Sequence, residues 1–178
     1  WTTLFCIIGA MSISALPFLS GFSAKSLITS AAGNEGLVAV TFVLLFASAG
    51  VMEHSGIKIP FFAFFAHDSG KRPKEAPWNM LAAMGIASAL CIGIGVYPRA
   101  LYDLLPYATD YNAYSVTHVV TQLELLLFAG LAFALLLKFG AYPAEVKSIN
   151  LDFDWFYRKV APSFIQSSLS LMRDVANA

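Results

Sequence analysis

The chain has 178 residues, of which 58% are hydrophobic and only 12% are charged, and its formal net charge is zero. A water-soluble domain carries charged residues at about a quarter of its positions, so this composition excludes a soluble globular domain. The balanced charge also argues against a nucleic-acid partner. The composition indicates a protein whose surface faces the lipid bilayer rather than water.

Four apolar blocks follow one another along the chain, at 1–32, 37–66, 80–98 and 115–137. A transmembrane helix needs roughly 20 residues, so the last two blocks fit one span each, whereas transmembrane β-strands would be shorter and alternating. The sequence therefore predicts an all-α, polytopic transmembrane helix bundle of about four spans over 1–140. An amphipathic tail is expected over 141–178.

The first block is interrupted at its centre by Pro17 and Gly21. Proline removes a backbone donor and clashes with the preceding turn, and glycine costs a helix about another 1 kcal/mol. We expect two half-helices around an unwound 17–21 segment, with an ordinary proline kink as the alternative. Unwound backbone cannot face lipid, so protein or a polar cavity should cover it.

Two aromatic segments are expected near the lipid headgroups. The first, at 61–65, follows Pro60, which predicts a bend near the end of the second block. The second, at 153–157, belongs to the tail, where Asp152 or Asn150 is predicted to cap a helix. We expect the tail to lie at the membrane interface, with docking on a partner protein as the alternative.

Basic residues are distributed unevenly between the loops. Segment 67–79 and the tail after the fourth block carry most of them: Lys71, Arg72, Lys74, Lys138, Lys147, Arg158, Lys159 and Arg173. Segments 33–36 and 99–114 hold a single arginine between them. The positive-inside rule therefore places segment 67–79 and the tail in the cytoplasm. Four alternating spans satisfy this arrangement, which predicts a multi-pass protein of the cell's inner (plasma) membrane.

Lys25 is the strongest candidate for function. It lies one turn past Gly21, and its side chain would have to reach over roughly two helical turns to the loop at 33–36. An ionisable group at membrane depth costs at least about 2.5 kcal/mol and is a functional candidate for that reason. Desolvation makes a buried ammonium group release its proton more readily. We expect Lys25 to accept protons on a transmembrane path, with a structural lysine as the alternative.

Three further ionisable residues are candidates for ion translocation. His54 and Lys58 are four residues apart and share a helix face, which suits a proton relay. The alternative for this pair is a hydrated position near the cytoplasmic end, without a role in transport. Glu124 lies deeper in the fourth block, where Gln122 offers a structural partner instead. For His118, only a few residues from its loop, a structural role is favoured.

No pattern in the sequence points to a cofactor or a metal site. Cys6 and Cys91 lie far apart in apolar runs and suit small hydrophobic fillers. Gly93 and Gly95 lie within an apolar block and favour close helix packing over nucleotide binding. The chain begins at Trp1 rather than Met, already in an apolar run, and we expect it to be a piece of a longer protein.

Four stretches carry a resemblance to a known family. The stretch 13–25 (ISALPFLSGFSAK) resembles the late broken helix of the antiporter-like membrane subunits. These subunits are shared by respiratory complex I, Mrp-type cation/proton antiporters and membrane-bound hydrogenases. The stretches 54–60 (HSGIKIP), 74–80 (KEAPWNM) and 152–158 (DFDWFYR) are most similar to the Mrp D branch. The resemblance runs through nearly the whole chain.

The resemblance implies the C-terminal part of an ion-translocating subunit, with Lys25 as the ion-path residue of the broken helix. The family's essential glutamate and lysine pair belongs to earlier helices that this chain lacks. Expected partners are other membrane subunits of a hetero-oligomeric assembly, the lipid bilayer, and protons, with exchange for a monovalent cation such as Na⁺. A redox-driven pump of a complex I-like or hydrogenase-like assembly is the first alternative. A stand-alone secondary transporter and a membrane scaffold are the others.

Overall fold

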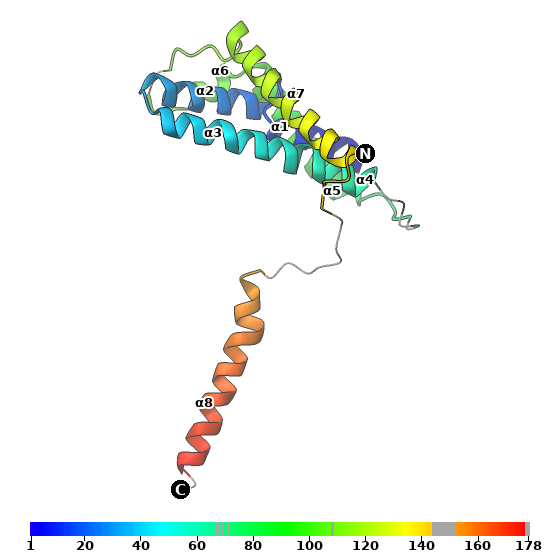
Figure 1. Ribbon diagram of the computed structural model, residues 1–178, viewed down its shortest axis with the longest axis vertical. Coiled ribbons are helices and arrows are strands. Elements are labelled where there is room, and N and C mark those ends of the chain that lie inside the picture. Colours follow the sequence, from blue (N-terminus) through cyan, green and yellow to red (C-terminus); the bar gives the residue numbers. More distant parts are fainter. Residues whose placement is uncertain (67, 69, 71, 108, 144–151, 177–178) are drawn as a thin grey trace. The chain divides into compact units, whose positions relative to one another are not determined.

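The computed structural model describes residues 1–66, 68, 70, 72–107, 109–143 and 152–176. The chain divides into two compact units, Trp1–Tyr142 and Pro143–Ala178. Throughout the described residues the regular structure is helical and contains no strand (Figure 1). This result confirms the predicted all-α fold.

The first apolar block forms two helices with an unwound segment between them. Helix α1 spans Thr2–Ile13 and helix α2 spans Ser20–Asn34. Between them Ala15 and Phe18 have φ angles of 62° and 69°, a left-handed conformation that is uncommon outside glycine. The backbone therefore reverses its helical sense at this point, which is a full break rather than a proline kink.

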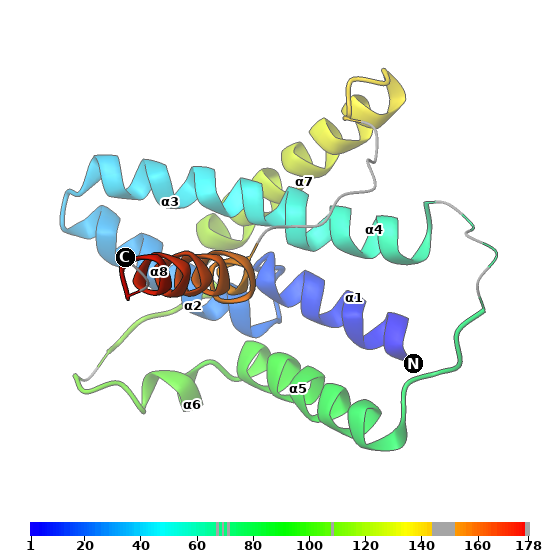
Figure 2. The ribbon, with the colours of Figure 1, turned by 90° about the horizontal axis from the view of Figure 1, so that it is seen from below.

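The second block forms one continuous rod from Val38 to Phe64 (Figure 2). It consists of α3 (Val38–Val51), the π-helix η1 (Met52–Lys58) and α4 (Ile59–Phe64). The sequence predicts a bend at Pro60, and the structure instead shows a widened helix directly before it. Pro60 has no N–H to donate to the preceding turn, and the π-helix lies where that turn of the α-helix would be interrupted.

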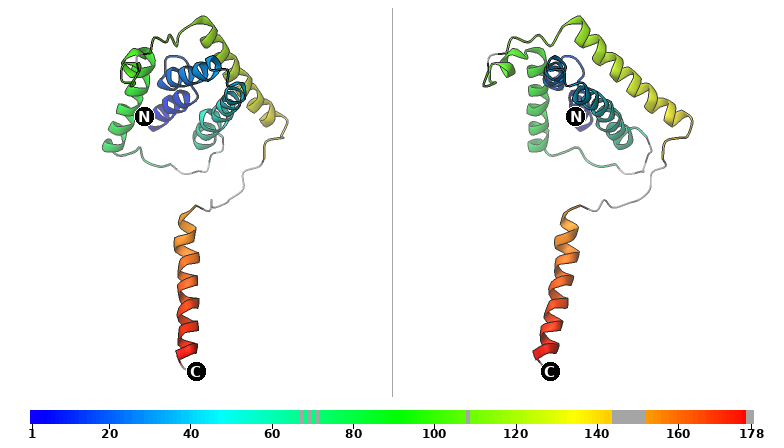
Figure 3. Two further views of the ribbon diagram at one scale, coloured as in Figure 1. Left: turned by 90° about the vertical axis from the view of Figure 1, so that its left-hand side faces the viewer. Right: turned by 60° about the vertical axis from the view of Figure 1, so that its left-hand side comes forward.

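The remaining helices of the first unit are α5 (Trp78–Val96), the short α6 (Arg99–Tyr102) and α7 (Val116–Lys138). Among the residues that the structure describes, three helical segments are long and apolar enough to cross a membrane: Val38–Phe64, Trp78–Val96 and Val116–Lys138. The broken pair α1 and α2 adds a further crossing, which gives about four spans, as predicted. Figure 3 shows these helices grouped into one bundle.

The second and last spans meet at an aromatic cluster formed by Phe61, Phe62, Phe133 and Tyr142. The rings of Phe61 and Phe62 lie edge-on to the ring of Phe133, with centroid distances of 5.9 and 6.5 Å. The ring centroids of Phe62 and Tyr142 are 5.7 Å apart. Part of the aromatic run expected to face the headgroups therefore packs inside the bundle. Phe65 remains 63% exposed and keeps the character of an interfacial residue.

The tail unit contains η2 (Phe156–Val160) and α8 (Ala161–Ala176). The carboxylate of Asp152 accepts a bond from the backbone N–H of Phe153 at 2.6 Å, and Asp154 forms an ion pair with Arg158. The alternative cap Asn150 and the basic residues Lys71 and Lys147 lie outside the described residues.

Candidate ion-translocation site

Protein groups cover the unwound segment between α1 and α2. The side-chain amide of Gln122, on α7, donates to the carbonyl of Ser14 at 3.2 Å. The hydroxyl of Tyr114 accepts from the backbone N–H of Phe18 at 3.2 Å and donates to the carbonyl of Gly95. The break thus finds the polar partners that unwound backbone in a membrane requires, as expected from the sequence.

Two glycines let the backbone close around the break. A Cβ at Gly21 would lie 1.8 Å from the carbonyl oxygen of Ser12. A Cβ at Gly95 would lie 2.3 Å from the Cα of Leu19, so α5 packs directly against the break. Close packing was predicted for Gly95 and also for Gly93, where nothing in the described structure lies within 4 Å of such a Cβ.

The π-helix η1 packs against the same break. A Cβ at Gly56 would lie 2.2 Å from the hydroxyl oxygen of Ser14. The same Ser14 hydroxyl donates to the backbone carbonyl of Ala10 at 2.7 Å. Widened helical turns recur at functional sites, and this one holds His54 and Lys58. The irregular parts of the first two spans are therefore in contact.

Lys25 lies in a cavity of about 260 Å³ between α2, α3 and α7. It is half-buried, and its ammonium group donates to the hydroxyl of Ser48 at 3.3 Å. The cavity lining also includes several uncharged polar side chains and one histidine: Ser26, Thr29, Ser30, His118, Thr121 and Gln122. Apolar side chains, among them Phe22, Leu44 and Val51, form the rest of the lining. The predicted site residue thus lies in a cavity of mixed polar and apolar lining between three helices of the bundle.

His118 belongs to a hydrogen-bonded cluster with Ser30 and Tyr111. Its Nε2 lies 3.2 Å from the Ser30 hydroxyl and its Nδ1 lies 3.1 Å from the Tyr111 hydroxyl. The two hydroxyl groups are 3.0 Å apart. The sequence analysis favours a structural role for His118. These contacts join residues up to 88 positions apart, which no local pattern reveals.

His54 and Lys58 do not join the Lys25 cavity, and neither residue lines it. The ammonium group of Lys58 lies 5.5 Å from the centre of the Tyr142 ring, beside the aromatic cluster. His54 is exposed on the surface of this unit. No hydrogen bond links the two side chains within the described part of the chain.

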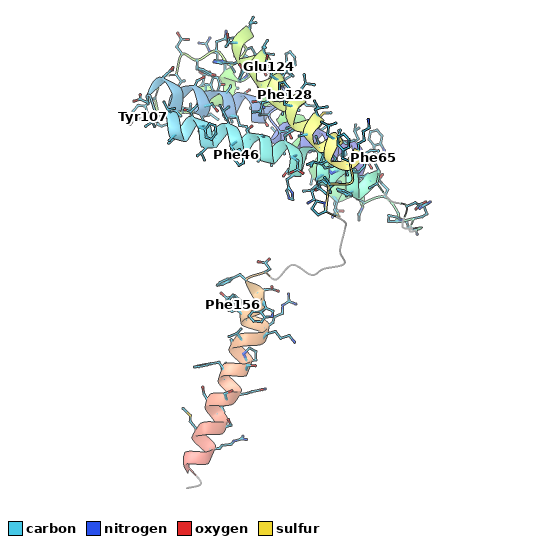
Figure 4. All side chains as sticks on the ribbon, in the orientation of Figure 1. Phe46, Phe65, Tyr107, Glu124, Phe128 and Phe156 are labelled. Carbon is cyan, nitrogen blue, oxygen red and sulfur yellow. The ribbon has the colours of Figure 1, made fainter. Side chains whose placement is uncertain are left out.

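Glu124 lies on the outer side of α7 (Figure 4). Its side chain is exposed, and the neighbouring Phe128 on the same helix is 70% exposed. Among the described residues, Glu124 has no hydrogen bond or ion pair, including with Gln122, which binds Ser14 instead. The structure therefore separates Glu124 from Lys25.

Comparison with known proteins gives relatives of one kind. The chain is 27% identical over 102 residues to the NADH-quinone oxidoreductase subunit N of Mycobacterium bovis and that of Mycobacterium tuberculosis. The match covers 56% of this chain and 19% of each relative, so the chain spans about a fifth of their length. No family model matches the sequence, and no solved structure matches it. The similarity supports the resemblance to the antiporter-like membrane subunits in general and leaves the finer assignment to the Mrp D branch unsupported.

Proposed function

We propose that this chain is part of an ion-translocating membrane subunit and that Lys25 carries protons within it. The observation that supports the proposal most directly is the half-buried Lys25 next to a broken helix, in a cavity that it shares with several polar side chains. Such a lysine is costly in a membrane unless it has a role there. Its hydroxyl partner Ser48 stabilises the ammonium group without neutralising it, so the charge remains free to be lost and regained.

The broken helix supports the same function. Gln122 and Tyr114 form hydrogen bonds with backbone groups of the break. These bonds stabilise the unwound segment in place of the hydrogen bonds of a regular helix. Discontinuous helices at membrane depth are a recurring means of placing an ion site between two half-channels. The similarity to subunit N of NADH-quinone oxidoreductase supports a proton-translocating role in a multi-subunit assembly.

Two driving forces fit this site. The similarity to subunit N favours a proton pump driven by electron transfer in other subunits. The stretches that resemble the Mrp D branch favour exchange of protons for a monovalent cation such as Na⁺. Transport measured with and without NADH in the assembled complex, in the presence and absence of Na⁺, separates the two.

The remaining predicted residues are proposed to act in the same assembly. Glu124 and His54 are exposed on this unit, and an uncompensated charge facing lipid is costly. We infer that other membrane helices of the assembly cover these two side chains. Lys58, beside the Tyr142 ring, is proposed to act apart from the Lys25 cavity.

The test is Lys25→Ala in the full-length protein, assembled with its partners. Removing a charge lowers the cost of insertion, so assembly should be unchanged. Proton transport into inverted vesicles, normalised to complex content, should fall to the background rate. Lys25→Arg should fail as well, because a guanidinium group keeps its proton. Transport at the wild-type rate in the assembled Lys25→Ala complex would show that Lys25 is structural.

The orientation of the chain is proposed from its loop charges. Segment 67–79 and the tail should lie in the cytoplasm, on the side opposite 99–114. Single cysteines at positions 72 and 110, in a protein without Cys6 and Cys91, should react with a membrane-impermeant reagent from opposite sides. Labelling of both positions from the same side would contradict the four-span arrangement.

A further inference from the structure

Two cavities of the first unit meet at the Tyr111 side chain. One is the Lys25 cavity, and the other, of about 860 Å³, lies between α6 and the segment that leads to α7. The second cavity is lined by exposed charged side chains: Arg99, Asp103 and Asp110. Tyr111 also lines this second cavity, and its hydroxyl binds Ser30 and His118, which line the first.

We propose that Ser30, His118 and Tyr111 form a proton relay between the Lys25 cavity and the cavity beside α6. The proposal rests on the proton-carrying role of Lys25. An imidazole can take a proton at one nitrogen and release one from the other. Here Nε2 is 3.2 Å from Ser30 and Nδ1 is 3.1 Å from Tyr111, so the two nitrogens have different partners.

The distance between Lys25 and the relay is spanned by the cavity itself. Its volume of about 260 Å³ exceeds the roughly 30 Å³ that one water molecule occupies. Most of its wall is apolar, and the polar groups that can hold water there are those of Ser26, Thr29, Thr121 and Gln122, together with Lys25 and the relay itself. A proton released by the Lys25 ammonium group would pass through water to Ser30 or His118, then to the Tyr111 hydroxyl and to solvent in the second cavity. The same steps run in reverse.

Tyr102 lines the same cavity as Tyr111, but its hydroxyl has different partners. Its ring lies 6.0 Å from that of Tyr111 and is 5% exposed. Its hydroxyl donates to the carbonyl of Ser23 at 2.9 Å, and burial raises the pKa of Tyr102 to about 12. That hydroxyl donates to a backbone acceptor and also has a hydrogen bond with the Ser26 side chain. Neither partner takes up or releases a proton, whereas the Tyr111 hydroxyl contacts the imidazole of His118, which can do both.

The experiment compares tyrosine and histidine variants in the full-length, assembled complex in inverted vesicles. Tyr111→Phe removes only the hydroxyl and keeps the ring that stacks on His118. Its proton transport should fall by about 10²-fold or more, which is the contribution that one positioned proton-transfer group typically makes. Tyr107→Phe is the matched control, because Tyr107 lines the same cavity but its ring is 82% exposed. This control should transport at the wild-type rate.

His118 variants separate a relay from a structural role. His118→Gln keeps a donor and an acceptor but cannot take up and release a proton, so transport should be low. If His118 had only a structural role, the glutamine would preserve it and transport should stay near the wild-type rate. His118→Ala should be slow as well and should recover in part when imidazole is added. Wild-type transport in both Tyr111→Phe and His118→Gln, with none in Lys25→Ala, would overturn the relay and leave the proposed function intact. Wild-type transport in Lys25→Ala would overturn the proposed function itself.

Discussion

The first two spans of the bundle are both irregular, but the first is interrupted by unwound backbone and the second by a widened helical turn. Between α1 and α2 the helical hydrogen bonding stops, and Ala15 and Phe18 adopt left-handed backbone conformations. In the second span the helix continues through η1 with a wider turn and no break in the rod. The first therefore exposes backbone groups to other partners, while the second keeps its own largely satisfied.

The two lysines have environments that match this difference. Lys25, in the second turn after the break, lies in a cavity between α2, α3 and α7 and binds Ser48. Lys58, at the end of the π-helix, lies over the aromatic ring of Tyr142. Under the proposed function, we therefore expect ion transfer to depend more on Lys25 and the first span than on Lys58 and the second.

The largest effect is expected from closing the break. Gly21→Ala would place a methyl group 1.8 Å from the Ser12 carbonyl oxygen, so the backbone must shift, at a cost of about 3 kcal/mol or more. The thermal unfolding midpoint of the purified complex should fall and little complex should assemble. Gly33→Ala is the control in the same helix, because nothing lies within 4 Å of its Cβ. Equal stability of the two variants would contradict the close packing at the break.

A smaller effect is expected where the two irregular segments touch. Gly56→Ala would place its methyl group 2.2 Å from the Ser14 hydroxyl, an overpacking that costs about 1–3 kcal/mol. Ser14→Ala removes that hydroxyl and should restore part of the stability of the double variant. Gly50→Ala, with nothing within 4 Å, is the control. Strictly additive losses in unfolding free energy would show that the two segments are not in contact.

The smallest effect is expected at Lys58. Lys58→Met removes the charge over the Tyr142 ring and keeps a flexible apolar side chain beside the aromatic cluster. Stability should change little, and proton transport should fall less than in Lys25→Ala. The same vesicle assay compares both variants side by side. A complete loss of transport in assembled Lys58→Met would place the second span on the path as firmly as the first.

The parts of the fold that depend on local chemistry could be predicted from the sequence. Pro17 and Gly21 indicate the break because their effects on a helix act within a turn or two. The apolar blocks indicate about four spans because the length of each block can be read directly from the sequence. The π-helix was not predicted, because Pro60 indicates that the helix is irregular without indicating the form of the irregularity. The contact of Gly56 with Ser14 was not predicted either, because the two residues are far apart in the sequence.

The candidate site was predicted only at its centre. Lys25 stands out in the sequence because charge at membrane depth is rare. The relay of Ser30, Tyr111 and His118 could not be found in this way, because serine, tyrosine and histidine near a loop are ordinary residues. Ser30 is 88 positions from His118, so only the tertiary structure brings the side chain of Ser30 to the start of α7 and to the segment before it.

The bond between Gln122 and the Ser14 carbonyl has a consequence for biogenesis. The two residues are 108 positions apart, and Tyr114 lies 96 positions beyond its partner Phe18. During synthesis the broken helix therefore leaves the ribosome long before the groups that complete it. Until α7 inserts, its free carbonyl and amide must be satisfied by water or by the insertion machinery. The broken helix therefore reaches its final form only after α7 is in place, and the Lys25 cavity, which α7 helps to line, forms at the same stage.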